Sequence, residues 1–205
     1  MQSLLELPYW PPVSWLAIAW HSDVLWLEAC EHYQKGSYRN RCHIAGPNGL
    51  QRLSIPLEKG KHQQTPIQEV RISYTENWQT QHWRSIQTAY GNAPYFEHYA
   101  DYLKPLYEKQ YEFLFDLNRQ LIELILIKKM HWPGELKLTN TFQGNSSAKQ
   151  SPDHPFNSLS NYHISSLSHY PQVFQEKHGF LPNLSVLDLL FCCGKNGTEI
   201  LENKR

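Results

Sequence analysis

The stretch that decides the fold is SLLELPYWPPVSWLAIAWHSDVLWL, residues 3–27. Residues 4–7 predict a short strand that Pro8 ends, and the Pro-Pro pair that follows suits the first turn of a helix. The run 13–21 has the length of a short helix, and the apolar run 24–27 has the length of a buried strand. A strand, a helix and a second strand in this order predict a βαβ-like unit with parallel strands and a right-handed crossover.

A hairpin is predicted next along the chain. Two strand-like runs, 41–45 and 51–57, flank the sequence GPNG at residues 46–49. Asn-Gly between such runs is a strong hairpin signal. Residues 70–74 alternate apolar and polar side chains, which predicts a further strand.

The rest of the chain is predicted to be mainly helical. Apolar and aromatic side chains recur every three or four residues in three stretches: Trp83 to Tyr90, Tyr95 to Leu106, and Leu114 to Leu124. Such stripes are typical of core-facing helices rather than of a cofactor site. Asn92 and Pro94 suit the cap and the first turn of the second helix. Shorter helices are expected over 171–178 and from Ser185 onward.

These elements predict an α/β fold, with α+β as the alternative, in a single domain over residues 1–205. The N-terminal βαβ-like unit and the hairpin precede a mainly helical C-terminal half. Residues 143–170 stand apart, because 8 of these 28 residues are Ser and no periodicity is visible. We expect a loop there, either a tolerated surface insertion, which is favoured, or a lid that closes on a substrate.

Composition argues against several classes of protein. Of the 205 residues, 40% are hydrophobic and 19% are charged, values typical of a globular domain and not of a disordered chain. The 19 Lys and Arg balance the 19 Asp and Glu, so no basic excess indicates a nucleic-acid partner. The 4 cysteines form no Cys-x-x-Cys pair, and free thiols suit a reducing cytosol.

We expect a cytoplasmic protein without a membrane span. The first basic residue is Lys35, so the start of the chain lacks the basic region of a secretory signal. The apolar run 13–20 has 8 residues, well short of the ~20 that a transmembrane helix needs.

The densest polar cluster is EHYQKGSYRNR, residues 31–41, between a predicted strand and the hairpin. Binding residues often occupy such connecting segments. Lys35, Arg39 and Arg41 could grip a phosphate or a carboxylate, because arginine pairs with both groups through two parallel hydrogen bonds. A histidine side chain can act as an acid or a base, so His32 is a candidate for either role. The alternative is a solvated loop whose charges pair with neighbouring glutamates.

Other polar residues have structural interpretations. The 11 histidines include no His-x-x-x-His or His-Glu-x-x-His pattern, so no metal site is assigned. His82 lies at the start of a helix with an apolar face, which favours a partly buried residue over a catalyst. Ser185 and Asp188 match a capping box, which we favour over a catalytic role for the carboxylate. Cys192 and Cys193 lie on an apolar helix and are interpreted as small buried hydrophobes.

The segment YQKGSYRNR, residues 33–41, resembles the signature of the WbqC-like family. Similar matches to the family follow the same order along the chain: LPYWPP at 7–12, DVL at 23–25, WRSI and YGNAPYF between 83 and 96, and PNLSVLDLLF at 182–191. The resemblance covers nearly the whole chain outside 143–170. Leu7 is a departure, because the family commonly has Gln there, and this puts a polar role for the first turn in doubt.

The family takes its name from a protein encoded among surface-polysaccharide (O-antigen) genes. The resemblance therefore implies a group-transfer enzyme that modifies an amino sugar or a sugar nucleotide by acyl or aminoacyl transfer. The positions that match the family and carry polar chemistry are Lys35, Tyr38, Arg39, Asn40, Arg41, His82 and Asp188.

Two hypotheses follow. In the first, an enzyme binds a sugar nucleotide or another phosphate-bearing donor through Lys35, Tyr38, Arg39, Asn40 and Arg41. His32 or His82 takes the proton of the attacking amine or hydroxyl. The sequence assigns no cofactor. In the second hypothesis, a non-catalytic partner or glycan-binding protein uses its aromatic and Arg-rich surface to hold a polysaccharide enzyme or a glycan.

Overall fold

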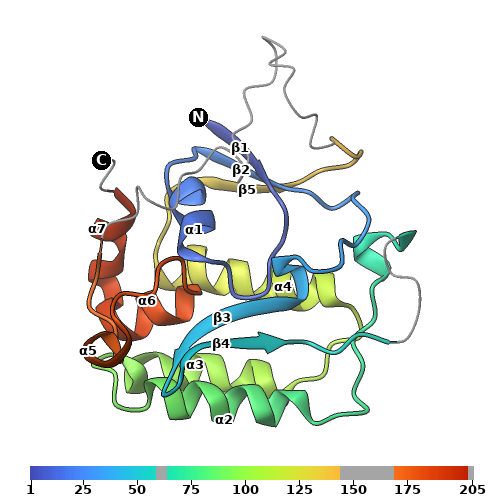
Figure 1. Cartoon of the computed structure of the whole chain (residues 1–205). Coiled ribbons are helices and arrows are strands. Elements are labelled where there is room, and N and C mark those ends of the chain that lie inside the picture. Colours follow the sequence, from blue (N-terminus) through green and yellow to red (C-terminus); the bar gives the residue numbers. More distant parts are fainter. Residues whose placement is uncertain (59–63, 144–168, 203–205) are drawn as a thin grey trace.

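The computed structural model describes residues 1–58, 64–143 and 169–202 (Figure 1). Strand β1 (Gln2–Leu5), helix α1 (Val13–Trp20) and strand β2 (Val24–Leu27) form the predicted N-terminal unit. The two strands pair in parallel, with Gln2 opposite Val24 and Leu5 opposite Leu27. The first strand ends two residues earlier than the sequence predicts. The α/β class is confirmed.

A third strand, β5 (Glu135–Leu138), pairs in parallel with the other side of β2, so the order of this sheet is β1-β2-β5. The sequence analysis missed β5. Its four residues are ELKL, and their side chains are exposed or only half-buried. A strand this short carries little signal of its own, and pairing with β2 is what holds it extended.

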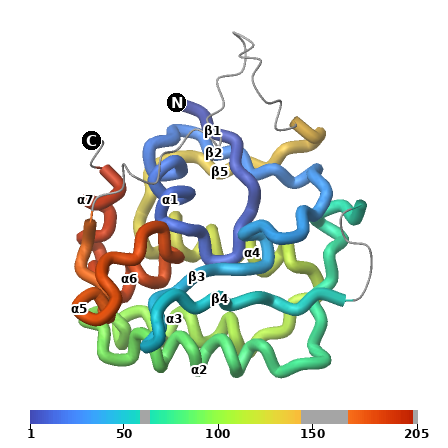
Figure 2. Tube along the Cα trace, in the orientation of Figure 1, coloured from blue at the N-terminus to red at the C-terminus, as the bar shows by residue number. Residues whose placement is uncertain are grey.

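The predicted hairpin is confirmed as β3 (Arg41–Gly46) and β4 (Gly49–Ser54), which pair in antiparallel register from Arg41 and Ser54 to Gly46 and Gly49. Gly49 has a φ of 101°, a conformation that side chains rarely adopt, so glycine suits this turn. In Figures 1 and 2 the hairpin lies between the parallel sheet and the helices α2 (Trp78–Tyr90) and α3 (Phe96–Glu108).

Two local predictions were wrong. Residues 70–74 form no strand, because Ile72 makes one isolated bridge with Leu57 and Arg71 another with Phe113, too little pairing for a ladder. Asn92 does not cap α3, which begins at Phe96 after a turn that holds Pro94 outside the helix. The backbone N–H of Tyr95 instead donates to the carbonyl of Phe191, 3.1 Å away. A tertiary contact thus sets this helix start.

The remaining helices follow the predicted periodicity. Helix α4 (Leu114–Ile122) continues into a π-helical segment, η4 (Glu123–Lys129). The C-terminal part contains α5 (Gln175–His178), α6 (Val186–Cys193) and α7 (Gly197–Glu202), and short 3₁₀ turns occur at η1 (Tyr38–Asn40), η3 (Ile67–Glu69) and η7 (Gly194–Asn196). The predicted loop or lid at 143–170 lies outside the described residues except at its ends. None of the helices within the described ranges combines the length and hydropathy that a bilayer span requires.

The turn between β1 and α1, residues 6–12, is buried in the core. Tyr9 and Trp10 are both almost fully inaccessible. Trp10 has a φ of 43°, an unusual conformation for a bulky residue. Its ring N–H donates to the Tyr107 hydroxyl at 2.7 Å, and burial of the ring helps to offset this strain.

The C-terminal segment caps α1. The backbone N–H of Val13 donates to the carbonyl of Leu184 at 2.9 Å, and that of Ser14 donates to Asn183 Oδ1 at 2.9 Å. Asn183 has a φ of 57°, which asparagine tolerates better than most residues. Residues far apart in sequence therefore satisfy the first N–H groups of the helix.

We expect Asn183→Asp to keep most of the stability of the chain, because a carboxylate can accept the same hydrogen bond. Asn183→Ala should lower the free energy of unfolding by about 1–2 kcal/mol, through the lost cap and the unfavourable φ. Urea denaturation of the two variants and the parent chain measures this difference. Equal stability of Asn183→Ala and the parent would show that the cap contributes nothing.

Candidate functional site

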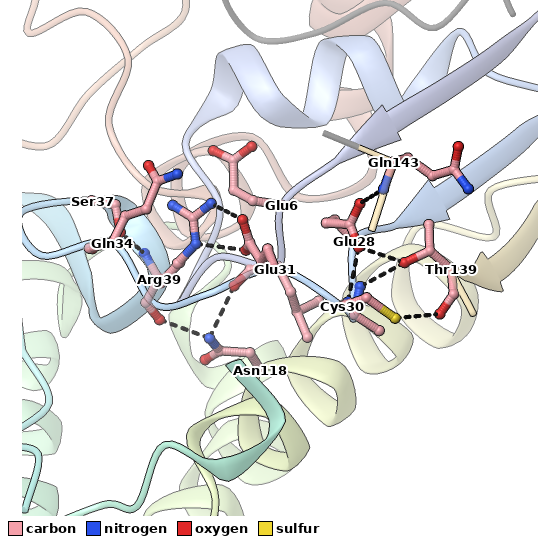
Figure 3. Close-up of polar contacts among 12 residues, drawn as sticks. Glu6, Glu28, Cys30, Glu31, Gln34, Ser37, Arg39, Asn118, Thr139 and Gln143 are labelled. Atoms are coloured by element: carbon pink, nitrogen blue, oxygen red, sulfur yellow. Dashed lines mark hydrogen bonds and ion pairs between the residues drawn. The ribbon is translucent and has the colours of Figure 1, made fainter. Parts of the chain in front are cut away.

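Polar side chains follow all three strands of the parallel sheet at their carboxyl ends (Figure 3). Glu6 follows β1, Glu28 follows β2 and Thr139 follows β5. Open α/β sheets bind ligands outside this edge, where the carboxyl ends of parallel strands meet. This edge is therefore the candidate functional site.

Glu28 holds the edge together. Its Oε1 accepts hydrogen bonds from the Thr139 hydroxyl at 2.6 Å and the backbone N–H of Cys30 at 2.8 Å. Its Oε2 accepts from the backbone N–H of Gln143 at 3.0 Å. The Thr139 hydroxyl oxygen also accepts from the backbone N–H of Ala29. With this many partners, Glu28 joins the ends of β2 and β5 and has a structural role.

Arg39 forms a buried ion pair with Glu31. The exposed fractions of the two residues are 4% and 5%. Arg39 Nε donates to Glu31 Oε1 at 2.6 Å, and Nη2 donates to Oε2. Burial raises the pKa of Glu31, and the guanidinium of Arg39 opposes that rise. The charge of Arg39 is therefore matched within the protein.

Glu6 differs from the other two carboxylates of this edge. It is half-buried, and no basic side chain of the described residues lies within ion-pair distance of its carboxyl group. Burial raises the pKa of Glu6, while its own backbone N–H and the charge of Arg39 act against this. A partly accessible carboxyl group with a raised pKa is suited to take up and release a proton in a reaction.

The sequence did not single out Glu6 as a candidate. It placed this residue inside a strand over 4–7, whereas β1 ends at Leu5. A carboxylate directly after a parallel strand is the signal that could have identified it. The strand boundary decides whether that signal is visible.

The predicted substrate-binding residues separate into two groups. Arg39 and Asn40 are structural. The Asn40 side chain donates to the carbonyl of Ile55 at 2.9 Å and accepts from the Tyr33 hydroxyl at 2.9 Å. Lys35 is exposed, and Tyr38 is half-buried. The Tyr38 ring meets the His43 ring edge-on, with 5.6 Å between the centroids.

Arg41 belongs to the second group, together with Lys35 and Tyr38. No carboxylate of the described chain forms an ion pair with its guanidinium. Its Nε is buried and lacks a hydrogen-bond partner. Its Nη2 lies 3.8 Å from the point that a Cβ on Gly36 would occupy, so the guanidinium reaches the segment that carries Lys35. Lys35 and Arg41 thus form a basic region on the segment that leads from β2 into β3.

The two histidines predicted to be catalytic lie in different surroundings. His32 is exposed, and its backbone forms an isolated bridge with Pro66. His82 is buried, with 5% of its surface exposed. Its Nδ1 lies 2.9 Å from the Tyr9 hydroxyl, which lies 3.0 Å from the hydroxyl of Tyr107.

Burial lowers the pKa of His82 to about 4, although the carbonyl of Ser54 opposes this by accepting a hydrogen bond. His82 is therefore neutral at pH 7. Its Nδ1 accepts from Tyr9, and the other ring nitrogen faces a backbone carbonyl. This arrangement gives His82 the task of holding the buried turn after β1.

The capping box at Ser185 is only half formed. The Ser185 hydroxyl accepts from the backbone N–H of Leu187 at 3.1 Å, as a cap should. Asp188 does not reach back, because the N–H of Ser185 donates to the carbonyl of His43 at 2.8 Å. The carboxylate of Asp188 is completely buried and accepts from Gln172 Nε2 at 3.1 Å. The structure thus corrects the capping role predicted for Asp188.

Burial raises the pKa of Asp188 to about 6, and the neighbouring side chains of Tyr170, Tyr90 and Gln172 oppose the rise. Cys192 and Cys193, one turn further along α6, are buried as predicted. Within the described ranges, no three or more His, Cys, Asp or Glu side chains are placed to hold a metal ion.

Comparison with known proteins identifies the family of this chain. The sequence profile of the WbqC-like protein family matches residues 8–152 and 135–200. The chain belongs to this family. Within 8–152 lie residues 8–12 of the buried turn, the hairpin and the segment from Glu28 to Arg41.

A relative from Mycobacterium tuberculosis (strain ATCC 25618 / H37Rv), described as Uncharacterized protein Rv1507c, is 31% identical over 197 residues. The match covers 82% of this chain and 83% of the relative. No solved structure matches the chain at a significant level.

The two arginines of this WbqC-like chain should respond differently to substitution. Arg39→Ala leaves a buried Glu31 carboxylate without its partner, so we expect a loss of about 3–5 kcal/mol in the free energy of unfolding. Arg41→Ala breaks no ion pair and should cost less than about 1 kcal/mol. Chemical denaturation measures both, and equal losses would contradict the assignment of Arg39 as the structural arginine.

A second variant separates the loss of the ion pair from the loss of packing at position 39. The double substitution Glu31→Gln with Arg39→Met removes both charges and should recover much of the stability lost in Arg39→Ala, because no buried charge is left unpaired. A double variant that is no more stable than Arg39→Ala would show that the guanidinium contributes through packing alone.

Asp188 should make stability depend on pH. Its pKa is raised to about 6 in the folded chain from an ordinary value of 3.8. The folded state therefore binds the proton more tightly, and the free energy of unfolding falls as pH rises from about 4 to about 6, by at most about 3 kcal/mol. Asp188→Asn cannot ionise, so the difference in stability between it and the parent chain should change over this range. Parallel stability curves for the two proteins would contradict the raised pKa.

Proposed function

We propose that this WbqC-like chain is a group-transfer enzyme of surface-polysaccharide biosynthesis that attaches an acyl or aminoacyl group to an amino sugar. The observation that carries the proposal is Glu6, a half-buried carboxylate without an ion-pair partner at the carboxyl edge of the parallel sheet. Family membership supports the pathway, and the position of Glu6 supports the chemistry.

The charges at this edge favour an amine acceptor. Glu6 and Glu31 share a single buried guanidinium, that of Arg39, which is paired with Glu31, and Glu28 adds a further carboxylate to this edge. The excess of negative charge attracts an ammonium group and repels a phosphate. We therefore place the amine of the acceptor beside Glu6.

Glu6 acts as the general base in this scheme. The amine nitrogen attacks the carbonyl carbon of the donor, a carbon–nitrogen bond forms, and the bond from that carbon to the leaving group breaks. Glu6 takes one proton from the bound ammonium before the attack, and the leaving group departs with the electron pair and takes up the second proton that the nitrogen loses. His32, exposed on the connecting segment after β2, is the second acid–base candidate. His82 leaves the scheme, because it is buried and neutral with Nδ1 occupied.

The donor binds through its phosphate in the basic region of Lys35 and Arg41. Tyr38, which lies between them in the sequence, also contributes to this binding. Arg41 has no ion-pair partner in the described chain and can form two parallel hydrogen bonds to phosphate oxygens. Arg39 cannot bind phosphate in this way without breaking its ion pair with Glu31.

The test is a transfer assay on the full chain with acyl-CoA and aminoacyl donors and sugar-nucleotide amino sugars as acceptors, read by mass spectrometry. Glu6→Gln should lower the transfer rate by about 10²–10⁴-fold, because the base is lost, with an almost unchanged melting temperature. Glu97→Gln, at an exposed position in the first turn of α3, is the matched control and should retain full rate.

The pH dependence of the same assay adds a second readout. Because the base must be deprotonated, the rate should rise with pH through the raised pKa of Glu6 and then level off. A fully active Glu6→Gln would remove Glu6 from the mechanism. Absence of turnover with every donor and acceptor, together with binding of a glycan, would favour the non-catalytic partner instead.

A further inference from the structure

The outward face of the hairpin carries a row of basic side chains. His43 on β3 lies directly opposite Arg52 on β4, and Arg41 lies two residues before His43 on the same strand. Directly opposed residues of an antiparallel pair share a face, and so do residues two apart on one strand. Arg41, His43 and Arg52 therefore lie on one face, with Arg52 exposed and the other two half-buried.

Within the described residues, neither Arg41 nor Arg52 takes part in an ion pair. Burial has the largest effect on His43 and lowers its pKa. The charges of Arg41 and then Arg52 lower it further, so both arginines act on the imidazole. Like charges directly opposite each other in a sheet are destabilising, and a protonated His43 would stand in this relation to Arg52. An anion on this face would remove that cost.

Arg41 also leaves a hydrogen-bond donor unused. Its Nε is buried and has no partner, whereas most buried polar atoms in native proteins have one. An oxygen of a bound anion is the acceptor that would satisfy it. The Tyr38 ring, edge-on to His43, borders the same place and adds an aromatic surface.

We propose that Arg41, His43 and Arg52 form a pyrophosphate subsite. One guanidinium belongs to the strand of His43 and the other to the residue directly opposite it, and each can take one phosphate group of a diphosphate through paired hydrogen bonds. Arg41 and His43 are about 7 Å apart along the strand, and Arg52 lies opposite His43. The long arginine side chains can converge over this spacing. The inference rests on the proposed function for the identity of the donor and adds His43 and Arg52 to its binding residues.

The shared chemistry of the ligand is a pyrophosphate ester, which both a nucleoside diphosphate and coenzyme A contain. Calorimetric titration of the full chain with inorganic pyrophosphate, UDP and coenzyme A separates the sources. We expect all three to bind and orthophosphate to bind at least 10-fold more weakly. Tighter binding of UDP than of coenzyme A would identify the sugar-nucleotide acceptor as the ligand of this subsite, and the reverse order an acyl-CoA donor.

Two charge-removing variants test the position of the subsite. Arg52→Gln alters an exposed side chain, so it should fold normally and weaken pyrophosphate binding by at least 10-fold. Lys128→Gln removes the same charge from an exposed position in η4 and should bind pyrophosphate as the parent does. Equal weakening in both variants would show a general charge effect and overturn the subsite.

His43 supplies a readout that a general charge effect would not move. We expect saturating pyrophosphate to raise the pKa of His43, followed by NMR of the imidazole, because the bound anion stabilises the protonated ring. An unchanged pKa, or no pyrophosphate binding at millimolar concentration, would overturn the inference.

The outcomes for this subsite and for the proposed function are separable. Pyrophosphate binding that depends on Arg52, without transfer to any amine, would support the subsite and contradict the enzyme. Transfer that is undiminished in Arg52→Gln would support the enzyme and overturn the subsite.

Discussion

Asn118 of α4 donates its side-chain amide to two backbone carbonyls, those of Leu7 at 3.1 Å and Arg39 at 2.7 Å. It thereby joins the turn after β1 to the segment after β2, and the N–H of Tyr9 adds a bond to the carbonyl of Tyr38. Asn118 is buried, so losing these bonds would leave polar backbone groups unsatisfied in the core. The positions of the carboxylate edge and of the basic region both follow from this contact.

The same contact explains why the residues of the signature segment divide in their roles. Arg39 and Asn40 face inward, where the ion pair with Glu31 and the bond to Ile55 hold η1 in place. Arg41 is the first residue of β3, and from there the strand directs alternate side chains outward. Arg39 and Arg41 thus have different roles, because the chain changes from a 3₁₀ turn to a strand between them.

Two buried ionisable groups have opposite effects on stability as pH changes. His82 has a lowered pKa, so the stability linked to its neutral ring is lost as pH falls below about 6.5 toward about 4. Asp188 has a raised pKa, so its protonation as pH falls from about 6 relieves the cost of a buried charge. His82 supports the turn after β1, and Asp188 connects α6 to Gln172 in the segment before α5. Each is adapted to one place in the core rather than to catalysis.

The sequence by itself determined the elements whose signals are local. The length and polarity of residues 3–27 predicted the βαβ unit, and Asn-Gly predicted the hairpin turn. Apolar periodicity located most of the helices. Each of these signals acts between residues that are close in the chain, so a single stretch is enough to show it.

Only the tertiary structure decided which polar residues are free. Pairing with β2 makes a strand of β5. Buried Glu31 forms an ion pair with Arg39, whereas Arg41, two residues away, has no ion-pair partner in the part of the chain that the structure describes. The end of β1 places Glu6 at the edge of the sheet. These outcomes depend on contacts between segments that are distant in sequence, and charge pairing and burial follow from such contacts rather than from residue type.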